Sequence, residues 1–341
     1  MGGAEVRPKR LRLEEWSLFT YVVRRTLQAI PLLILISLIL FVILHNAPGG
    51  GLGPYLQNPH ITQADIARLK HNLGFDKPIY VQYVIWLGHV IVGDFGYSTS
   101  NSEPVFSAIV ERLPATLELM ISSFVIAFLI GVSAGLFAAI RPYSIWDYFI
   151  TTFAFFGQSM PVFWFALMMQ LAFAVHGIPL PGGYQIQLPS AGISSGDTFD
   201  FGDRATHLVL PAIVLALLQV ALYSRFMRSS MLEVIKTDYM RTAWAKGLNF
   251  QTVLFKHGLK NALIPLVTVT ALTLPGLFGG AIVTETIFAW PGEGRLFFNA
   301  LGQQDIALMM GYLVFNAFLV VFFNLFADVA YAWLDPRVKY D

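Results

Sequence analysis

The residue types that usually carry chemistry show none of the spacings that such chemistry requires. A phosphate-binding loop needs Gly, four residues, and then Gly-Lys-Ser/Thr, and the chain contains no such run; Lys246-Gly247 has the reverse order. The seven histidines lack the H-E-x-x-H spacing of a zinc site, and there is no Cys to supply thiolates. No Ser/His/Asp arrangement stands out either. We therefore predict that the chain is not an enzyme, has no catalytic residues, and holds neither a metal nor a cofactor of its own.

Composition predicts a protein that lies in a membrane. Apolar residues make up 56% of the 341 residues and charged residues only 13%, which is about half the charged share of an ordinary globular protein. A helix that crosses a bilayer needs about 20 mostly apolar residues. Six stretches meet this need, so we predict an all-α integral membrane protein with six transmembrane helices. Their approximate bounds are 26–47, 115–140, 148–175, 207–224, 262–284 and 306–327.

Acidic side chains in these stretches lie near the ends. Glu118 and Glu285 fall near the predicted outer ends, and Asp328 near the inner end of the last stretch. A carboxylate at mid-membrane costs about 2.5–3.5 kcal/mol and usually marks an ion path. This distribution argues against a proton- or sodium-coupled carrier. We expect Glu118 to meet solvent or to pair with Arg112.

Basic residues predict the orientation of the six helices. With an even number of spans both termini share one side, and that side receives sixteen of the 22 Lys and Arg residues, with six opposite. Short loops rich in Lys and Arg stay in the cytoplasm, so both termini are predicted to be cytoplasmic. The predicted parts are a cytoplasmic tail with an interfacial helix (1–25), a transmembrane domain (26–335) with external loops 47–113 and 176–206 and a cytoplasmic loop 229–260, and a cytoplasmic C-terminal tail (336–341).

The predicted cytoplasmic loop contains a short sequence that would form a two-faced (amphipathic) helix, DYMRTAWAKGL from Asp238 to Leu248. At about 100° per residue, its apolar and small side chains gather on one half of a helix and its polar ones on the other. Asp238 suits the N-cap, and Gly247 suits the helix end because glycine tolerates a positive φ. An interfacial membrane anchor would show the same pattern. The apolar half comprises Tyr239, Met240, Ala243, Trp244, Gly247 and Leu248, and the polar half Asp238, Arg241, Thr242, Ala245 and Lys246.

This loop resembles that of permeases of binding-protein-dependent ABC importers, and specifically the first permease of dipeptide/oligopeptide systems. The loop signature of that superfamily is Glu-Ala-Ala, three residues, Gly, nine residues, Ile-x-Leu-Pro, and here Arg241-Thr242-Ala243 and Gly247 occupy its first part. This chain departs from the superfamily signature at several positions. Its own version, RTA-x-AKGL followed by KH-x-L-x-NALIP, resembles that of the peptide branch. Further motifs follow in the family's order: HNAPG (45–49), LGFDKP (73–78), GDFGYS (93–98), RLPATLEL (112–119), PGEGRL (291–296, with Glu293 where Leu is commoner) and LDPR (334–337).

The resemblance implies the type I importer permease fold and a multi-pass protein of a bacterial or archaeal cell membrane. It also implies partners: a second homologous permease subunit, two cytoplasmic ABC ATPase subunits that bind ATP and Mg²⁺, an extracytoplasmic solute-binding protein, a peptide substrate and membrane lipid, with no nucleic acid. The helix that would couple the ATPase to this chain comprises Asp238, Tyr239, Arg241, Thr242, Ala243, Trp244, Lys246, Gly247 and Leu248.

Two further groups of residues are candidates for contact with substrate or with the binding protein. Polar residues and kinks in the third and fifth stretches predict a pathway lined by Gln158, Ser159, Pro161, Thr268, Thr270, Thr273 and Pro275, although Thr on a membrane helix often bonds its own backbone. The second external loop carries Asp197, Asp200 and Asp203, which either help to dock the binding protein or only solvate the loop.

Two alternatives remain at the level of sequence. Close relatives of the family import nickel complexes or oligosaccharides, and cargo selectivity resides largely in the binding protein. A non-transporting membrane scaffold that recruits cytoplasmic partners through the two-faced helix would also fit the pattern.

Overall fold

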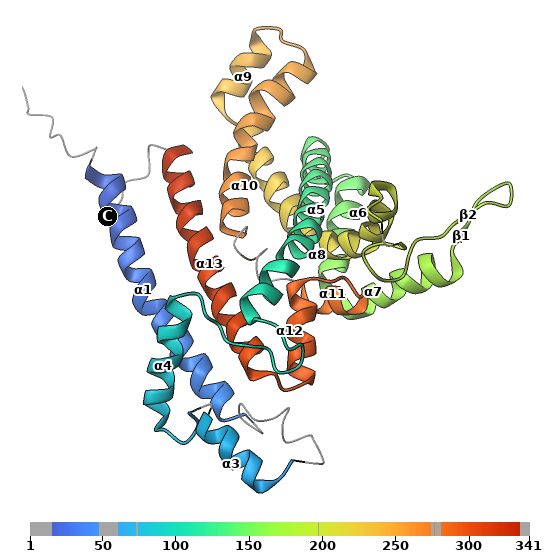
Figure 1. Cartoon of the computed structure of the whole chain (residues 1–341). Coiled ribbons are helices and arrows are strands. Elements are labelled where there is room, and N and C mark those ends of the chain that lie inside the picture. The colour runs from blue at the N-terminus through green and yellow to red at the C-terminus, as the bar shows by residue number, and fades with distance from the viewer. Residues whose placement is uncertain are drawn as a thin grey trace, which may run out of the picture.

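The computed structural model describes residues 16–47, 61–72, 74–196, 198–273, 276 and 281–334. Helices make up nearly all of its regular structure (Figure 1). The only strands in the described ranges form a short antiparallel hairpin, β1 Ile178–Pro179 and β2 Gln185–Ile186. The predicted all-α class is confirmed.

Four helices are long and apolar enough to cross a membrane: α1 Trp16–His45, α5 Val105–Ile140, α8 Phe201–Ile235 and α13 Ile306–Leu334. A fifth span is formed if α6 Ile145–Ser159 is counted together with α7 Val162–Met169 and the π-helical turn η2 Gln170–His176. The two halves of this pair meet at an angle of 104°.

The remaining predicted span, 262–284, begins as α10 Lys260–Thr273, which has 14 residues. Part of its second half, including Pro275, lies outside the described residues. The count of six and the side on which both termini lie therefore stay predictions, because residues 1–15 and 335–341 are also outside the described ranges.

Several helix boundaries differ from the sequence prediction. Both α5 and α8 start earlier than expected, at Val105 and Phe201, so they include the last residues of the predicted external loops 47–113 and 176–206. The fourth stretch was expected to end at Ser224, but α8 continues to Ile235 because the side chains beyond the apolar stretch also find partners. Met227 and Met231 are fully buried, and Arg228 pairs with Asp147 of α6. At the N-terminus, α1 begins at Trp16 and runs without a break into the first span, so the described residues contain no separate interfacial helix.

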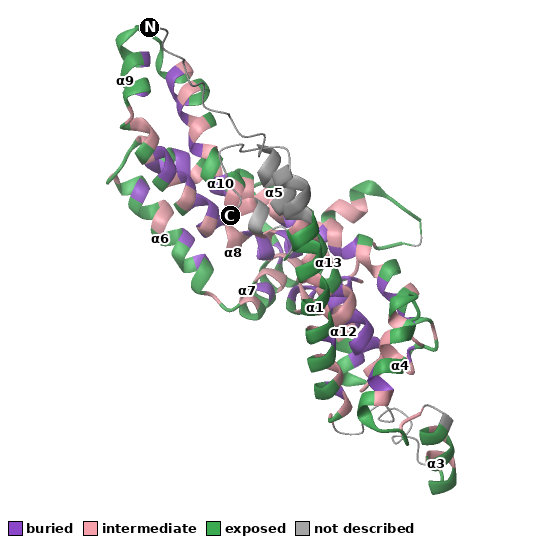
Figure 2. Ribbon diagram, turned by 90° about the vertical axis from the view of Figure 1, so that its left-hand side faces the viewer, coloured by how far each residue is buried: buried purple, intermediate pink, exposed green. Residues whose placement is uncertain are grey.

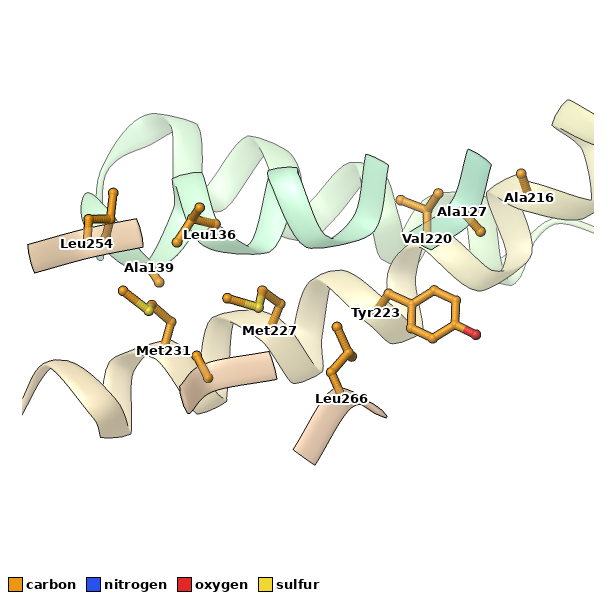
Figure 3. Packing of buried hydrophobic residues seen from close by; sticks show 11 residues of the cluster. Ala127, Leu136, Ala139, Ala216, Val220, Tyr223, Met227, Met231, Leu254 and Leu266 are labelled. Carbon is orange, nitrogen blue, oxygen red and sulfur yellow. The ribbon is translucent and has the colours of Figure 1, made fainter. Parts of the chain in front are cut away.

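The core of the bundle is the close packing of α5 against α8. Gly131 and Gly135 lie one turn apart on α5, where a Cβ at position 131 would stand 2.6 Å from the Cβ of Tyr223 and one at position 135 would stand 2.8 Å from that of Met227. Small residues let membrane helices approach backbone to backbone. Around this contact Leu136, Val220 and Met231 pack together with Leu266 of α10, as Figure 3 shows.

A second group of helices packs around α1 and α13. The apolar stretch near residues 81–92 forms α4 Ile79–Ile91, which lies along α1 through Tyr83. The Tyr83 hydroxyl lies 2.9 Å from Ser37 Oγ, and its ring contacts Phe41. The preceding helix, α3 Gln63–Asn72, starts at a reciprocal cap in which Thr62 and Asp65 bond to each other's N–H groups. In Figure 2 the exposed residues cover most of α1, as expected for a helix that faces lipid.

Two short helices join α10 to α13 at a distance from α9. These are α11 Ile282–Ile287 and α12 Glu293–Gly302, and Trp290 between them donates its indole N–H to the Ala115 carbonyl of α5 at 2.8 Å. Asp305 then begins α13: its buried carboxylate accepts bonds from Ser98 Oγ, from the N–H and Oγ of Ser100, and from the N–H of Leu308. Although burial opposes it, these donors hold the pKa of Asp305 below its usual value.

Candidate functional site

The predicted two-faced helix is present as α9 Asp238–Ala245, at the far end of α8. It is followed by a turn, by the π-helical segment η3 Thr252–Leu259 and then by α10. Figure 1 shows α9 standing out from the bundle at the opposite end from α12. This segment therefore carries α9 away from the bundle while its two ends continue into α8 and, through η3, into α10.

One side of α9 packs back onto its own chain. Met240 and Ala243 are buried and form a small cluster with Val253 of η3, against which Val234 of α8 also packs. Gly258 makes room for the methionines, because a Cβ there would meet the terminal methyl group of Met231 at 2.6 Å and that of Met240 at 3.4 Å. The inner face thus fixes the angle of α9 relative to α8 and η3.

The other apolar side chains of α9 and its turn are exposed. Tyr239, Trp244, Leu248 and Phe250 keep between 37% and 50% of their surface open, and the Trp244 and Phe250 rings lie 6.1 Å apart. The apolar half of the predicted helix is therefore divided, with Ala243 facing inward and the aromatic residues facing outward. Adjoining exposed apolar groups of this kind mark a surface for another protein or a membrane.

Polar residues border this surface. Arg241 and Asp238 form an exposed pair at 3.4 Å, and the Thr242 hydroxyl donates to the Asp238 carbonyl. The expected N-cap role of Asp238 is wrong by one position. Thr237 is the N-cap and makes no side-chain cap bond, because its hydroxyl donates to Val234 O, so Asp238 instead occupies the first helical position. A carboxylate there still favours the positive end of the helix dipole.

Gly247 closes the helix as predicted. Its φ is +73°, and its N–H donates to Trp244 O at 2.9 Å. A Cβ at this position would meet no described atom within 4 Å, so glycine is required here by the backbone conformation and not by lack of space. The left-handed residue turns the chain from Lys246, the C-cap, toward η3.

The pathway candidates lie on two helices that both pack against α8. Gln158 and Ser159 are exposed at the end of α6, where Pro161 begins α7 at the bend. On α10 most Thr hydroxyls bond locally: Thr268 donates to Ile264 O, and Thr273 donates to Thr270 O and lies 3.5 Å from the Tyr223 hydroxyl. The Thr270 hydroxyl is buried with no partner among the described residues. Since α6 and α10 lie to either side of α5 in Figure 1, one chain does not bring the two groups together.

The acidic loop residues have structural contacts of their own. Asp200 caps α8 by accepting the Gly202 N–H at 2.8 Å. Asp203 accepts the Ser195 N–H at 2.6 Å and lies 3.5 Å from His207. The third member, Asp197, lies outside the described residues.

Both halves of the chain match a known protein family. Residues 131–340 match the family described as "Binding-protein-dependent transport system inner membrane component", and residues 18–120 match the N-terminal part of such components. The chain belongs to this family.

Several curated relatives resemble this inner membrane component over nearly their whole length. The oligopeptide transport system permease protein AppB of Bacillus subtilis is 43% identical over 322 residues, which cover 94% of this chain and 99% of AppB. The dipeptide transport system permease protein DppB of Alkalihalophilus pseudofirmus is 40% identical, covering 95% of this chain and all of DppB. DppB of Escherichia coli K12 is 36% identical, covering 94% of this chain and 98% of DppB. The resemblance drawn from the motifs is confirmed.

Two ion pairs of this inner membrane component fix α8 to its neighbours. Near one end of α8, Arg204 donates to both carboxylate oxygens of Glu118 on α5, with Nε 2.9 Å from each and a further contact from Nη2. Near the other, Arg228 holds the buried Asp147 of α6 through two bonds of 2.7 Å. The expected pairing of Glu118 with solvent or Arg112 is therefore wrong. Its partner is 86 residues away in sequence, where local spacing gives no signal.

Proposed function

We propose that this chain is the permease subunit of an ATP-driven importer and forms half of the translocation pathway for di- or oligopeptides. Family membership supports the importer class, and the similarity to oligopeptide and dipeptide permeases supports peptide cargo. Nickel complexes and oligosaccharides remain alternative cargoes.

The observation that carries the mechanism is the division of α9 into two faces. Met240 and Ala243 tie the helix to η3 and α8, while Tyr239, Trp244 and Leu248 face outward. In this proposal the outward residues dock on an ABC ATPase subunit that binds ATP and Mg²⁺. The inner contacts transmit the movement of that subunit to α8 and α10. A helix that is rigid and packed on one side moves as a unit, so ATPase closure reaches the spans without being absorbed in the loop.

The proposed assembly contains two permease subunits, two ATPase subunits and an extracytoplasmic solute-binding protein that delivers the peptide. In it α6 and α10 of each permease subunit face a pathway completed by the second, homologous subunit. The side chains available there are mostly neutral: Gln158, Ser159 and Thr268. Weak, neutral contacts suit a substrate that is handed over by another protein and must be released.

The test is peptide uptake by the reconstituted assembly. The chain is co-purified with its partners, placed in liposomes with ATP inside, and given binding protein loaded with a labelled dipeptide or oligopeptide. Accumulation that requires both ATP and the binding protein is expected. A matched preparation carries ATPase subunits whose phosphate-loop lysine is replaced. Equal uptake with and without active ATPase would contradict the proposal, and the scaffold alternative gives no accumulation at all.

Asp200 and Asp203 provide a test of binding-protein docking. If their charges steer the encounter, the pair of substitutions Asp200→Asn and Asp203→Asn should lower the association rate about tenfold at low salt, with the difference disappearing at high salt. Asparagine still caps a helix, so α8 should keep its start. Stopped-flow measurements across ionic strength report the rate, and Glu111→Gln on α5 is the matched charge-removing control. An unchanged salt dependence would assign both Asp residues to loop structure alone.

A further inference from the structure

Two carboxyl groups are buried together where α5, α11 and α12 meet. Glu285 of α11 and Glu293 of α12 are both fully shielded from solvent, and Thr116 of α5 joins them. The Thr116 hydroxyl donates to Glu285 Oε1 at 3.0 Å and accepts the backbone N–H of Glu293 at 2.8 Å. The site lies at the opposite end of the fold from α9, as Figure 1 shows.

The two carboxyl groups differ in their partners. Besides Thr116, Glu285 accepts the N–H of Arg295 at 3.0 Å and that of Ala281 at 3.3 Å. Neither carboxyl oxygen of Glu293 has a hydrogen-bond partner within the described part of the chain. An ionised carboxylate buried without a partner is among the most costly groups in a protein, and it takes up a proton instead.

The charged and titratable groups around Glu293 do not offset this cost. Glu285 adds a like charge from α11. The Arg295 guanidinium on α12 donates to Ala289 O at 2.6 Å, and α13 contributes the phenol of Tyr312. The N-terminal end of α12 favours an anion, but its N–H groups at Glu293 and Arg295 are already bonded to Thr116 and Glu285. Burial, and then the charge of Glu285, raise the pKa of Glu293 to about 8.

The backbone on either side of Glu293 is closely packed against α5 and α11. Gly292 and Gly294 flank Glu293, and a Cβ at position 292 would collide with Glu285 Oε2 and Thr116 Oγ1. A Cβ at position 294 would stand 2.8 Å from the Cα of Ile282. A metal ion would need several more oxygen ligands than the two free ones of Glu293. A proton needs neither space nor further ligands.

We propose that Glu293 is a proton-binding site, which holds one proton at neutral pH beside Glu285 and thereby keeps α12 packed on α5 and α13. The folded chain then binds a proton that the unfolded chain has released at any pH between the ordinary value for glutamate, 4.5, and about 8. Stability should therefore fall as the pH rises through this window and level off above it.

Thermal unfolding of the full-length chain, purified with its partners in lipid nanodiscs, tests this dependence from about pH 5 to about pH 9. The wild type should lose Tm steadily with rising pH. Glu293→Gln keeps the shape and removes the ionisation, so its Tm should be flat across the window and higher than the wild type at the alkaline end. Asp305→Asn is the matched control, because this buried carboxylate accepts four hydrogen bonds. This variant should have a lower Tm than the wild type around pH 7, but its Tm should still fall as the pH rises.

Infrared spectroscopy reports the proton itself and does not depend on folding energetics. The wild type should show the C=O stretch of a protonated carboxylic acid at pH 7, lost on titration to alkaline pH and absent in Glu293→Gln. Glu285→Gln should shift the midpoint of this titration to lower pH, because it removes the neighbouring charge. Three results would overturn the proposal: no such band in the wild type, a band that survives in Glu293→Gln, or a fall of Tm with pH that disappears when sodium ions are added.

Discussion

Replacing Gly135 with leucine is expected to force α5 and α8 apart and to destabilise the bundle. A Cβ at this position would collide with the Ser224 carbonyl oxygen and would stand 2.8 Å from the Cβ of Met227. The atoms contacted are a backbone oxygen and a Cβ, which cannot move aside without a shift of the α8 backbone. Overpacking a core usually costs about 1–3 kcal/mol, and occasionally more. We expect the upper end here, because two long helices must move apart.

The measurement is the free energy of unfolding in mixed detergent micelles, together with the yield of folded protein. Gly88→Leu on α4 is the matched control, since a Cβ there meets nothing within 4 Å. It should fold with a stability close to that of the wild type. If Gly135→Leu matched the control, the close contact between α5 and α8 would not be the core of this protein.

Replacing Gly247 with valine is expected to uncouple ATP hydrolysis from transport while leaving the spans folded. The φ of +73° at this position costs an L-residue about 1–2 kcal/mol, and a β-branched one at least that much. This cost lowers the equilibrium population of the turn that closes α9, relative to its open form, by a factor of about 5–30. Because the site has open space around it, the penalty falls on the turn and not on the packing of Met240 and Ala243.

Peptide uptake and ATPase activity of the reconstituted assembly should be measured side by side. Uptake per ATP hydrolysed should fall by a similar factor, with normal membrane insertion and yield. Gly247→Asn is the control, because asparagine adopts positive φ more readily than other L-residues; it should retain more coupling than valine. Full uptake by Gly247→Val would remove the coupling role from this turn.

Several elements of this protein are determined by short stretches of sequence. The periodicity of DYMRTAWAKGL predicted α9, and glycine at position 247 predicted the left-handed end, because both depend on a few consecutive residues and on backbone sterics. Likewise, runs of about 20 apolar residues predicted α1, α5 and α13. Helix boundaries failed at α8, where burial of Met227 and Met231 extends the helix beyond its apolar stretch.

The sequence by itself therefore determined the all-helical class, the order of the apolar helices, the helix after α8 and the motifs that place the chain in its family. Only the tertiary structure decided which half of α9 is exposed, that Glu118 pairs with Arg204, and that Glu293 is buried beside Glu285 without a partner. The physical reason is that hydrogen bonding within a helix is satisfied by neighbours four residues away. The burial and charge of a side chain, by contrast, depend on helices brought together from distant parts of the chain.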